Sequence, residues 1–140
     1  MSLRAVPLIA IPLVLYNILV MLGGSGPPAD ILATRIFSLP VITAPGASMP
    51  FTWGDALLFV TLLVLFIEIV KATYTTTASL LDHGLSMLVF VVCLIEFLVV
   101  PKAATSIFLF ITMATLIDVI AGYTIGIRVA KRDLQIGGGE

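Results

Sequence analysis

Four long apolar stretches divide this chain and limit what it can fold into. They cover roughly residues 5–22, 53–72, 80–100 and 102–127. About 20 apolar residues in a helix cross the ~30 Å hydrocarbon layer of a bilayer. The 140 residues are 60% apolar and 11% charged, and a soluble domain of this size has too little interior to hide that excess. We therefore predict an all-α integral membrane protein, a single membrane domain with four transmembrane helices.

The first apolar stretch has two interpretations, a membrane helix or a secretory signal. The small residues after it run directly into Pro27 and Pro28, which are poor neighbours for signal cleavage. We therefore favour a membrane helix over residues 5–22. Pro12 lies inside this stretch, and because proline removes a backbone donor we expect it to kink the helix.

The linker over residues 23–52 contains too many glycines and prolines for a long helix. Within residues 29–39, however, Leu32, Ile36 and Leu39 recur at helical spacing. This pattern predicts a short amphipathic helix in the membrane interface, ended by Pro40. An irregular loop over the other helices is the alternative.

Helix starts are marked by capping residues. Thr52 and Asp55 form a capping-box pattern ahead of the second span, and Ser79 and Asp82 repeat it ahead of the third. Pro101 suits the first turn of the fourth span, so spans three and four form a helical hairpin. Residues 128–140 are expected to form a cytoplasmic tail that contains Gly137, Gly138 and Gly139.

Basic residues predict the orientation in the membrane. Five of them fall on the side of the N-terminus and two on the other side: Arg4, Lys71, Arg128, Lys131 and Arg132 against Arg35 and Lys102. The positive-inside rule then places both termini in the cytoplasm and the 23–52 linker outside. We expect the location to be a bacterial cytoplasmic membrane.

Three carboxylates, Glu68, Glu96 and Asp118, fall within the apolar stretches, where an ionised group costs about 3 kcal/mol. Asp118 shares a helix face with four small residues: Ala114, Ala121, Gly122 and Gly126. The spacing of the two glycines allows another helix backbone to approach closely. Asp118 is therefore expected to face a packed helix, either as a structural contact or as a proton or cation site.

The other two carboxylates have candidate partners. Lys71 follows Glu68 by three residues, which predicts an ion pair at the membrane edge. Glu96 is expected to pair with Lys102 across the helical hairpin. Asp82 and His83 should lie near Lys71 and form a cytoplasmic polar cluster with it. In the third span, Ser86 and Cys93 lie on the same helix face as Asp82 and Glu96 and form a polar stripe with them. We expect the polar stripes of spans two to four to face each other or a partner protein.

Several chemistries are excluded by what the sequence lacks. The single cysteine, Cys93, rules out an intrachain disulfide and any paired-cysteine motif, and the single histidine, His83, rules out a haem held by two histidines of this chain. The net charge of −1 offers no basic stripe for nucleic acid. No phosphate-binding loop, nucleophile elbow or paired-histidine zinc motif occurs. We predict no enzyme activity and no cofactor bound by this chain alone, with lipid left open as a ligand.

These observations favour an accessory, assembly or scaffold subunit of a larger membrane complex. Its partners would be the lipid bilayer and other membrane subunits, or further copies of the chain. The alternative is a homo-oligomeric transporter or channel that moves protons or cations with Glu68, Glu96 and Asp118. A third class, a lipid-modifying enzyme, would use Lys71, Asp82 and His83.

Overall fold

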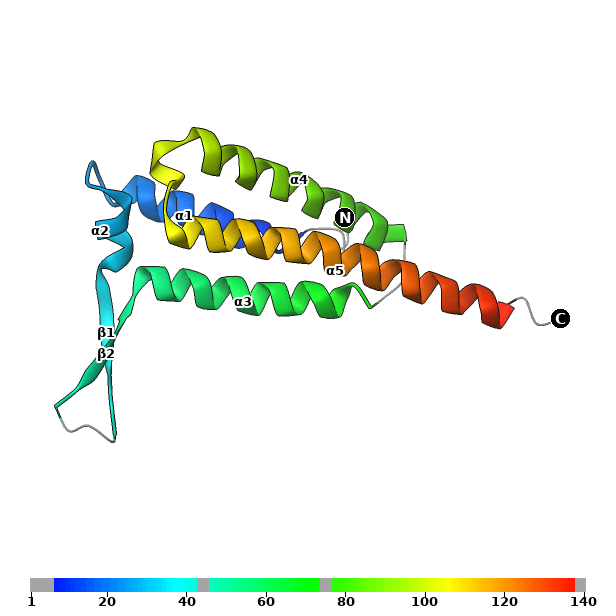
Figure 1. Cartoon of the computed structure of the whole chain (residues 1–140), viewed down its shortest axis with the longest axis horizontal. Coiled ribbons are helices and arrows are strands. Elements are labelled where there is room, and N and C mark those ends of the chain that lie inside the picture. Colours follow the sequence, from blue (N-terminus) through cyan, green and yellow to red (C-terminus); the bar gives the residue numbers. More distant parts are fainter. Residues whose placement is uncertain (1–6, 43–45, 74–76, 138–140) are drawn as a thin grey trace.

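Four helices run side by side, and a β-hairpin projects from one end of them (Figure 1). The computed structural model describes residues 7–42, 46–73 and 77–137, with side chains in the last range at 82–128 and 131. The bundle consists of α1 (Ala10–Leu22), α3 (Trp53–Lys71), α4 (Thr77–Val99) and α5 (Ser106–Gly137). Successive bundle helices alternate in direction. The connection from α3 to α4 therefore lies at one end, the turn end, and the segment between α1 and α3 lies at the other, the hairpin end.

Within the part of the chain that the structure describes, three helices are long and apolar enough to cross a membrane, over Trp53–Lys71, Asp82–Val99 and Ser106–Arg128. The fourth, α1, is apolar but has only 13 residues, about 20 Å at 1.5 Å per residue. The expected membrane helix over residues 5–22 is thus shorter than predicted. The structure supports a helical membrane protein with three helices of spanning length and one shorter helix.

Pro12 does not kink α1, contrary to the prediction. Because the helix begins at Ala10, Pro12 falls in its first turn. The amide groups of a first turn have no partner within the helix, so a proline there removes no hydrogen bond. The predicted kink assumed a helix that began several residues earlier.

The linker contains both a short helix and a hairpin. The helix α2 covers only Pro28–Ala33, and the strand β1 (Arg35–Pro40) pairs antiparallel with β2 (Ser48–Thr52). The predicted amphipathic helix over residues 29–39 is therefore wrong in its second half. Stacking of Phe37 on Phe51 across the strands, at 4.7 Å between ring centroids, favours the hairpin over continued helix.

The capping box at the start of α3 is confirmed. The Thr52 hydroxyl accepts a hydrogen bond from the Asp55 amide at 3.2 Å, and the Thr52 amide donates to Asp55 Oδ2 at 2.8 Å. The second predicted box is wrong, because α4 begins at Thr77 and Ser79 lies inside its first turn. No glycine or proline between residues 77 and 82 stops the helix from extending ahead of the apolar stretch.

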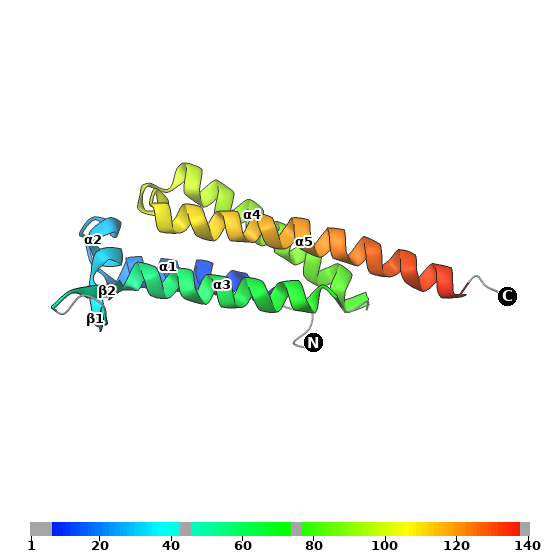
Figure 2. The ribbon, with the colours of Figure 1, turned by 60° about the horizontal axis from the view of Figure 1, so that its bottom comes forward.

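The fourth span starts later and continues further than expected. Pro101 begins a short 3-10 helix, η2 (Pro101–Ala103), and α5 follows at Ser106. The hydroxyl of Thr105 accepts a hydrogen bond from the Phe108 amide at 3.1 Å and so caps this later start. The helix then continues to Gly137 through the expected tail, and it projects beyond the other helices (Figures 1 and 2).

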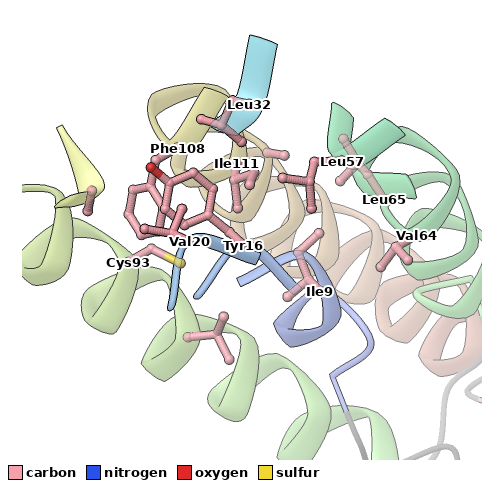
Figure 3. Close-up of a cluster of buried hydrophobic side chains, with 13 residues drawn as sticks. Ile9, Tyr16, Val20, Leu32, Leu57, Val64, Leu65, Cys93, Phe108 and Ile111 are labelled. Atoms are coloured by element: carbon pink, nitrogen blue, oxygen red, sulfur yellow. The ribbon is translucent and has the colours of Figure 1, made fainter. Parts of the chain in front are cut away.

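Apolar side chains from all four bundle helices meet in one core (Figure 3). The helix α5 packs against both α3 and α4, and α1 lies against all three. Large apolar side chains on the outer faces remain uncovered, such as Leu62 and Phe66 on α3, which are 64% and 65% exposed. Such a surface is stable only against hydrocarbon or a partner protein.

Tyr16 fastens the short helix α1 to the hairpin end of α5. Its hydroxyl donates to the carbonyl of Lys102 at 2.8 Å and lies 2.8 Å from the Thr105 hydroxyl. The ring meets Phe108 edge to face at 4.7 Å and is only 1% exposed. A single side chain thus joins α1, the η2 turn and the start of α5.

Replacing Tyr16 by phenylalanine should destabilise the bundle. The Tyr16→Phe variant keeps the ring but removes the hydroxyl that contacts the Lys102 carbonyl and the Thr105 hydroxyl, and the loss of such a hydrogen bond costs about 1 kcal/mol. Unfolding of the purified protein in detergent, followed by circular dichroism, measures the loss. Tyr123→Phe is the control, because Tyr123 is 44% exposed, and it should change stability by less than about 0.5 kcal/mol. Equal effects of the two variants would contradict the anchoring role.

Candidate functional site

Polar side chains from α3, α4 and α5 gather toward the turn end of the bundle. We call them the polar cluster: Glu68 and Lys71 on α3, Asp82, His83 and Ser86 on α4, and Asp118 on α5. Five of the six are buried, and the Lys71 side chain is 19% exposed. The structure thus brings Glu68 and Asp118 together with the predicted cytoplasmic group of Lys71, Asp82 and His83.

Lys71 bridges two carboxylates on different helices. Its ammonium lies 2.9 Å from Glu68 Oε2, as the spacing along α3 predicts, and 3.0 Å from Asp82 Oδ1 on α4. Glu68 also accepts a hydrogen bond from the backbone amide of Leu8, just ahead of α1. The glutamate was expected at the membrane edge, yet it is only 2% exposed. It is a buried junction of α1, α3 and α4.

Asp118 is also buried and is not part of an ion pair among the described residues. Its carboxyl group is 4% exposed and faces Ser86, which is 1% exposed. The charges of Asp82 and Lys71 also act on it. Nevertheless Asp118 Oδ2 and Ser86 Oγ form no hydrogen bond of good geometry with any described residue. Buried polar atoms in this state are rare and call for a physical explanation.

His83 occupies the space that the glycine pair of α5 leaves open. A Cβ atom on Gly122 would lie 2.5 Å from His83 Nδ1, and one on Gly126 would lie 3.8 Å from Nε2. The two glycines were expected to let another helix approach closely, and α4 does pack against this face of α5, through the His83 side chain. The glycines seat an imidazole ring, because the side chain of α4 is long enough to fill the gap. Nε2 is buried and has no hydrogen-bond partner among the described residues.

The remaining predicted residues lie outside the polar cluster. Glu96 is half-buried on α4, and no ion pair joins it to the exposed Lys102, which contradicts the predicted pairing. Glu96 lies in the last turn of α4, whereas Lys102 lies within the η2 turn, and the carboxyl group of Glu96 is within electrostatic range of Tyr16 and Cys93. Ala114 is buried on α5, whereas Ala121 is half-buried.

The hairpin is a second candidate surface, and the sequence analysis missed it. It projects sideways from the bundle, across the direction of the helices (Figure 1). Six of its large apolar side chains are exposed: Ile36, Phe37, Leu39, Val41, Ile42 and Met49. The helical spacing of three apolar residues hid the strand, because a six-residue segment fits either period.

Two apolar grooves run along the outer surface of the bundle. One, of about 260 Å³, lies between α1 and α3 and includes Leu19, Trp53 and Val60. The other, of about 280 Å³, lies between α3 and α5 and includes Leu62, Phe110 and Met113. Almost all of their lining is apolar, which suits an acyl chain or an apolar helix. They offer nothing that would hold a charged ligand.

The chemistry available at the polar cluster is the binding of a proton or other small cation. Within the residues that the structure describes, no group of three His, Cys, Asp or Glu side chains is arranged to hold a metal ion. Cys93 is fully buried in the apolar core, where a thiol is inert. The groups that the polar cluster offers to a ligand are carboxyl, imidazole and hydroxyl groups, beside the ammonium of Lys71.

The seat of His83 predicts opposite effects for two glycine substitutions. Gly122→Ala would drive a methyl group into the imidazole and should lower the free energy of unfolding by about 1–3 kcal/mol. Gly84→Ala is the matched control, because a Cβ there meets no atom within 4 Å, and it should raise stability by up to about 1 kcal/mol. Denaturant unfolding in detergent measures both variants.

Removing the His83 imidazole should reduce the destabilisation that Gly122→Ala causes. In His83→Ala the added methyl group of Gly122→Ala has room, so the double variant should lose less than the sum of the single variants. Additive losses would show that His83 does not occupy the glycine surface in the folded protein.

Comparisons with known protein families, with characterised proteins and with solved structures found no match to this chain. No activity or partner can therefore be transferred from a relative. The polar cluster and the exposed hairpin are the two features from which a function can be argued.

Proposed function

We propose that the chain is an accessory, assembly or scaffold subunit of a larger membrane complex, and that the hairpin is its contact surface. The observation that carries this proposal is the set of exposed apolar side chains on a hairpin that lies outside the bundle. Ile42, next to the tip, is 95% exposed. An exposed apolar surface of this kind is covered by a membrane or by another protein, and a hairpin that lies to the side of the bundle suits a protein partner.

The hairpin is also poorly stabilised by itself. A two-stranded sheet is at best marginally stable in water, because it buries little apolar surface. Stacking of Phe37 on Phe51 and the hydrogen bond from the Trp53 amide to the Thr34 carbonyl, 3.2 Å long, support its base. Each strand keeps one edge unpaired within the described residues, and an unpaired edge can accept a further strand. A partner strand would satisfy these edge groups and cover the apolar side chains.

The proposed arrangement has four membrane-embedded helices with both termini in the cytoplasm. The alternating directions of α1, α3, α4 and α5 support it, because they put the start of α1, the end of α5 and Lys71 on one side and Arg35 and Lys102 on the other. That distribution follows the positive-inside rule. The hairpin would then face the extracytoplasmic side of a bacterial cytoplasmic membrane, and α1 would be held in the bilayer by its contacts with the longer helices.

A homo-oligomeric transporter or channel for protons or cations is the second candidate. The unpaired buried atoms of Asp118, Ser86 and His83 favour it. An open pore through one chain is not supported, because the buried apolar side chains of Tyr16, Phe108 and Ile111 fill the bundle toward the hairpin end. Movement of ions would require a second conformation or a path between copies.

Purification from the native membrane in mild detergent tests the proposed role. The tagged chain should bring larger subunits with it in fixed stoichiometry, as measured by intact mass. Ile42→Ser and Phe37→Ser should lower their recovery, because both remove apolar contact area from the hairpin. Ser38→Ala, on the same strand, is the control and should leave recovery unchanged. A homo-oligomer with no companion would contradict the proposal.

Ion flux through reconstituted liposomes separates the second candidate from the first. A transporter or channel based on Asp118 loses flux in Asp118→Asn while its assembly persists. For an accessory subunit we expect instead that the parent protein carries no flux, that Asp118→Asn is tolerated, and that Gly122→Leu impairs assembly because it displaces His83. Proton flux in the parent that Asp118→Asn abolishes would favour transport.

A further inference from the structure

The polar cluster carries more negative than positive charge. Three carboxylates, Glu68, Asp82 and Asp118, are each at least nine-tenths buried, and one ammonium, that of Lys71, lies among them. With every carboxylate ionised and His83 neutral, the described groups would hold a net charge of about −2. An uncompensated charge is strongly unfavourable in a buried site of low dielectric, so such a group binds a proton instead.

The ion pairs indicate which carboxylate lacks compensation. Lys71 lies within 3.0 Å of oxygens of both Glu68 and Asp82, and Glu68 has the Leu8 amide as a further donor. Asp118 Oδ2 has no ammonium beside it among the described residues, and the Ser86 hydroxyl that faces it forms no hydrogen bond of good geometry with it. Of the three, Asp118 is therefore the carboxyl group that gains most from a proton.

We propose that Asp118, Ser86 and His83 form a proton-binding site between α4 and α5, with the proton held on Asp118. A proton on Oδ2 converts this unpaired acceptor into a donor that faces the Ser86 hydroxyl, so that one bound proton can satisfy two of the unpaired atoms. Two bases and a hydroxyl group suit a proton better than an alkali cation, which prefers several oxygen ligands. This inference does not rest on the accessory role.

Every neighbouring helix contributes to the environment of Asp118. The α4 helix presents Asp82, His83 and Ser86, and α3 presents Glu68 and Lys71. On α5 itself, Tyr123 lies against His83 at 5.9 Å between ring centroids. From the α1 side the Leu8 amide is bound to Glu68. Within this set Lys71 is the only permanent cation, and it already forms ion pairs with Glu68 and Asp82.

His83 is the group through which this proton exchanges with water at the turn end. Its Nδ1 lies over Gly122, one helical turn from Asp118, and its Nε2 points to Gly126, one further turn toward the C-terminus. The four residues from Asp118 to Gly122 correspond to about 6 Å along α5. Because Nε2 is buried, exchange requires the turn end to open to water. Hydronium then gives a proton to Nε2 while the Nδ1–H bond breaks, and a proton passes through a bridging water molecule to Asp118 Oδ2. The ring stays neutral, and one water molecule and one carboxylic acid are formed.

Infrared spectroscopy of the full chain in lipid nanodiscs tests the site directly. At neutral pH we expect a carbonyl stretching band of a protonated carboxylic acid, which Asp118→Asn removes. Asp30→Asn, the same change at an exposed position, should leave the band in place. Labelling aspartate with carbon-13 in the parent protein should shift the band and distinguishes Asp118 from Glu68 even if the variant does not fold.

Three outcomes would overturn the proposed site. They are the absence of the band at neutral pH, its persistence in Asp118→Asn, and a band that appears only when sodium is replaced by choline. The last outcome would identify an alkali cation as the occupant. None of them bears on co-purification of a partner, so the failure of one proposal would not hide the failure of the other.

Exchange into heavy water tests the role of His83. In His83→Phe, which keeps a ring on Gly122 but has no nitrogen, the deuterium shift of the band should develop at least about tenfold more slowly, since a positioned acid–base group typically contributes more than this. Tyr123→Phe, beside His83, is the control and should exchange at the parent rate. An unchanged rate in His83→Phe would overturn the assignment of His83.

Discussion

The cost of placing charge in hydrocarbon determines how this bundle is closed at the turn end. Lys71 is held between Glu68 and Asp82, so an ammonium and two carboxylates stabilise each other where each alone would be unfavourable. These groups come from α3 and α4, and the Leu8 amide ahead of α1 adds a third segment. Only a short connection joins α3 to α4. The ion pair of Lys71 with Asp82 holds the two helices together beside this connection.

Packing around α5 satisfies the polar groups that the ion pairs do not reach. The hydroxyls of Thr112 and Thr115 donate to carbonyls of their own helix at 3.0 and 2.7 Å, so they add no unpaired group to the centre of the bundle. Toward the hairpin end, Tyr16 places its hydroxyl on the η2 turn. Between these ends the core is apolar. Among the described residues, Asp118, Ser86 and His83 carry the buried side-chain atoms that lack a hydrogen bond, whereas the other buried polar side chains are paired.

Features set by neighbouring residues could be predicted from the sequence. The capping box at Thr52 and the pairing of Glu68 with Lys71 both depend on residues three positions apart, whose geometry any helix supplies. The apolar stretches likewise indicated the long helices α3, α4 and α5. In each case the local pattern and the final structure agree because no distant segment competes.

Features that depend on distant segments could not be predicted. Strand β1 exists because Phe37 meets Phe51, and the period of its own residues does not reveal this partner. The glycine pair of α5 indicated close packing, but whether a backbone or His83 would fill the space depends on the rotation of α4, which no local pattern specifies. The effect of Pro12 likewise depends on where α1 begins. Because the helix begins at Ala10, Pro12 lies in the first turn and removes no hydrogen bond.

The hairpin and the polar cluster lie at opposite ends of the same two helices. At the hairpin end, Gly54 of α3 brings α2 and α5 close, because a Cβ there would lie 3.3 Å from the Leu32 carbonyl and 3.1 Å from the Ile107 side chain. Glu68 lies 14 residues further along α3, or about 21 Å. The base of the hairpin is thus fixed to α3, the helix that carries Glu68 and Lys71. In the same way, α5 contacts the hairpin end through Ile107 and contributes Asp118 to the polar cluster. A partner on the hairpin and a proton on Asp118 would act on one rigid pair of helices, so any coupling between them must be carried by the tilt or rotation of α3 against α5.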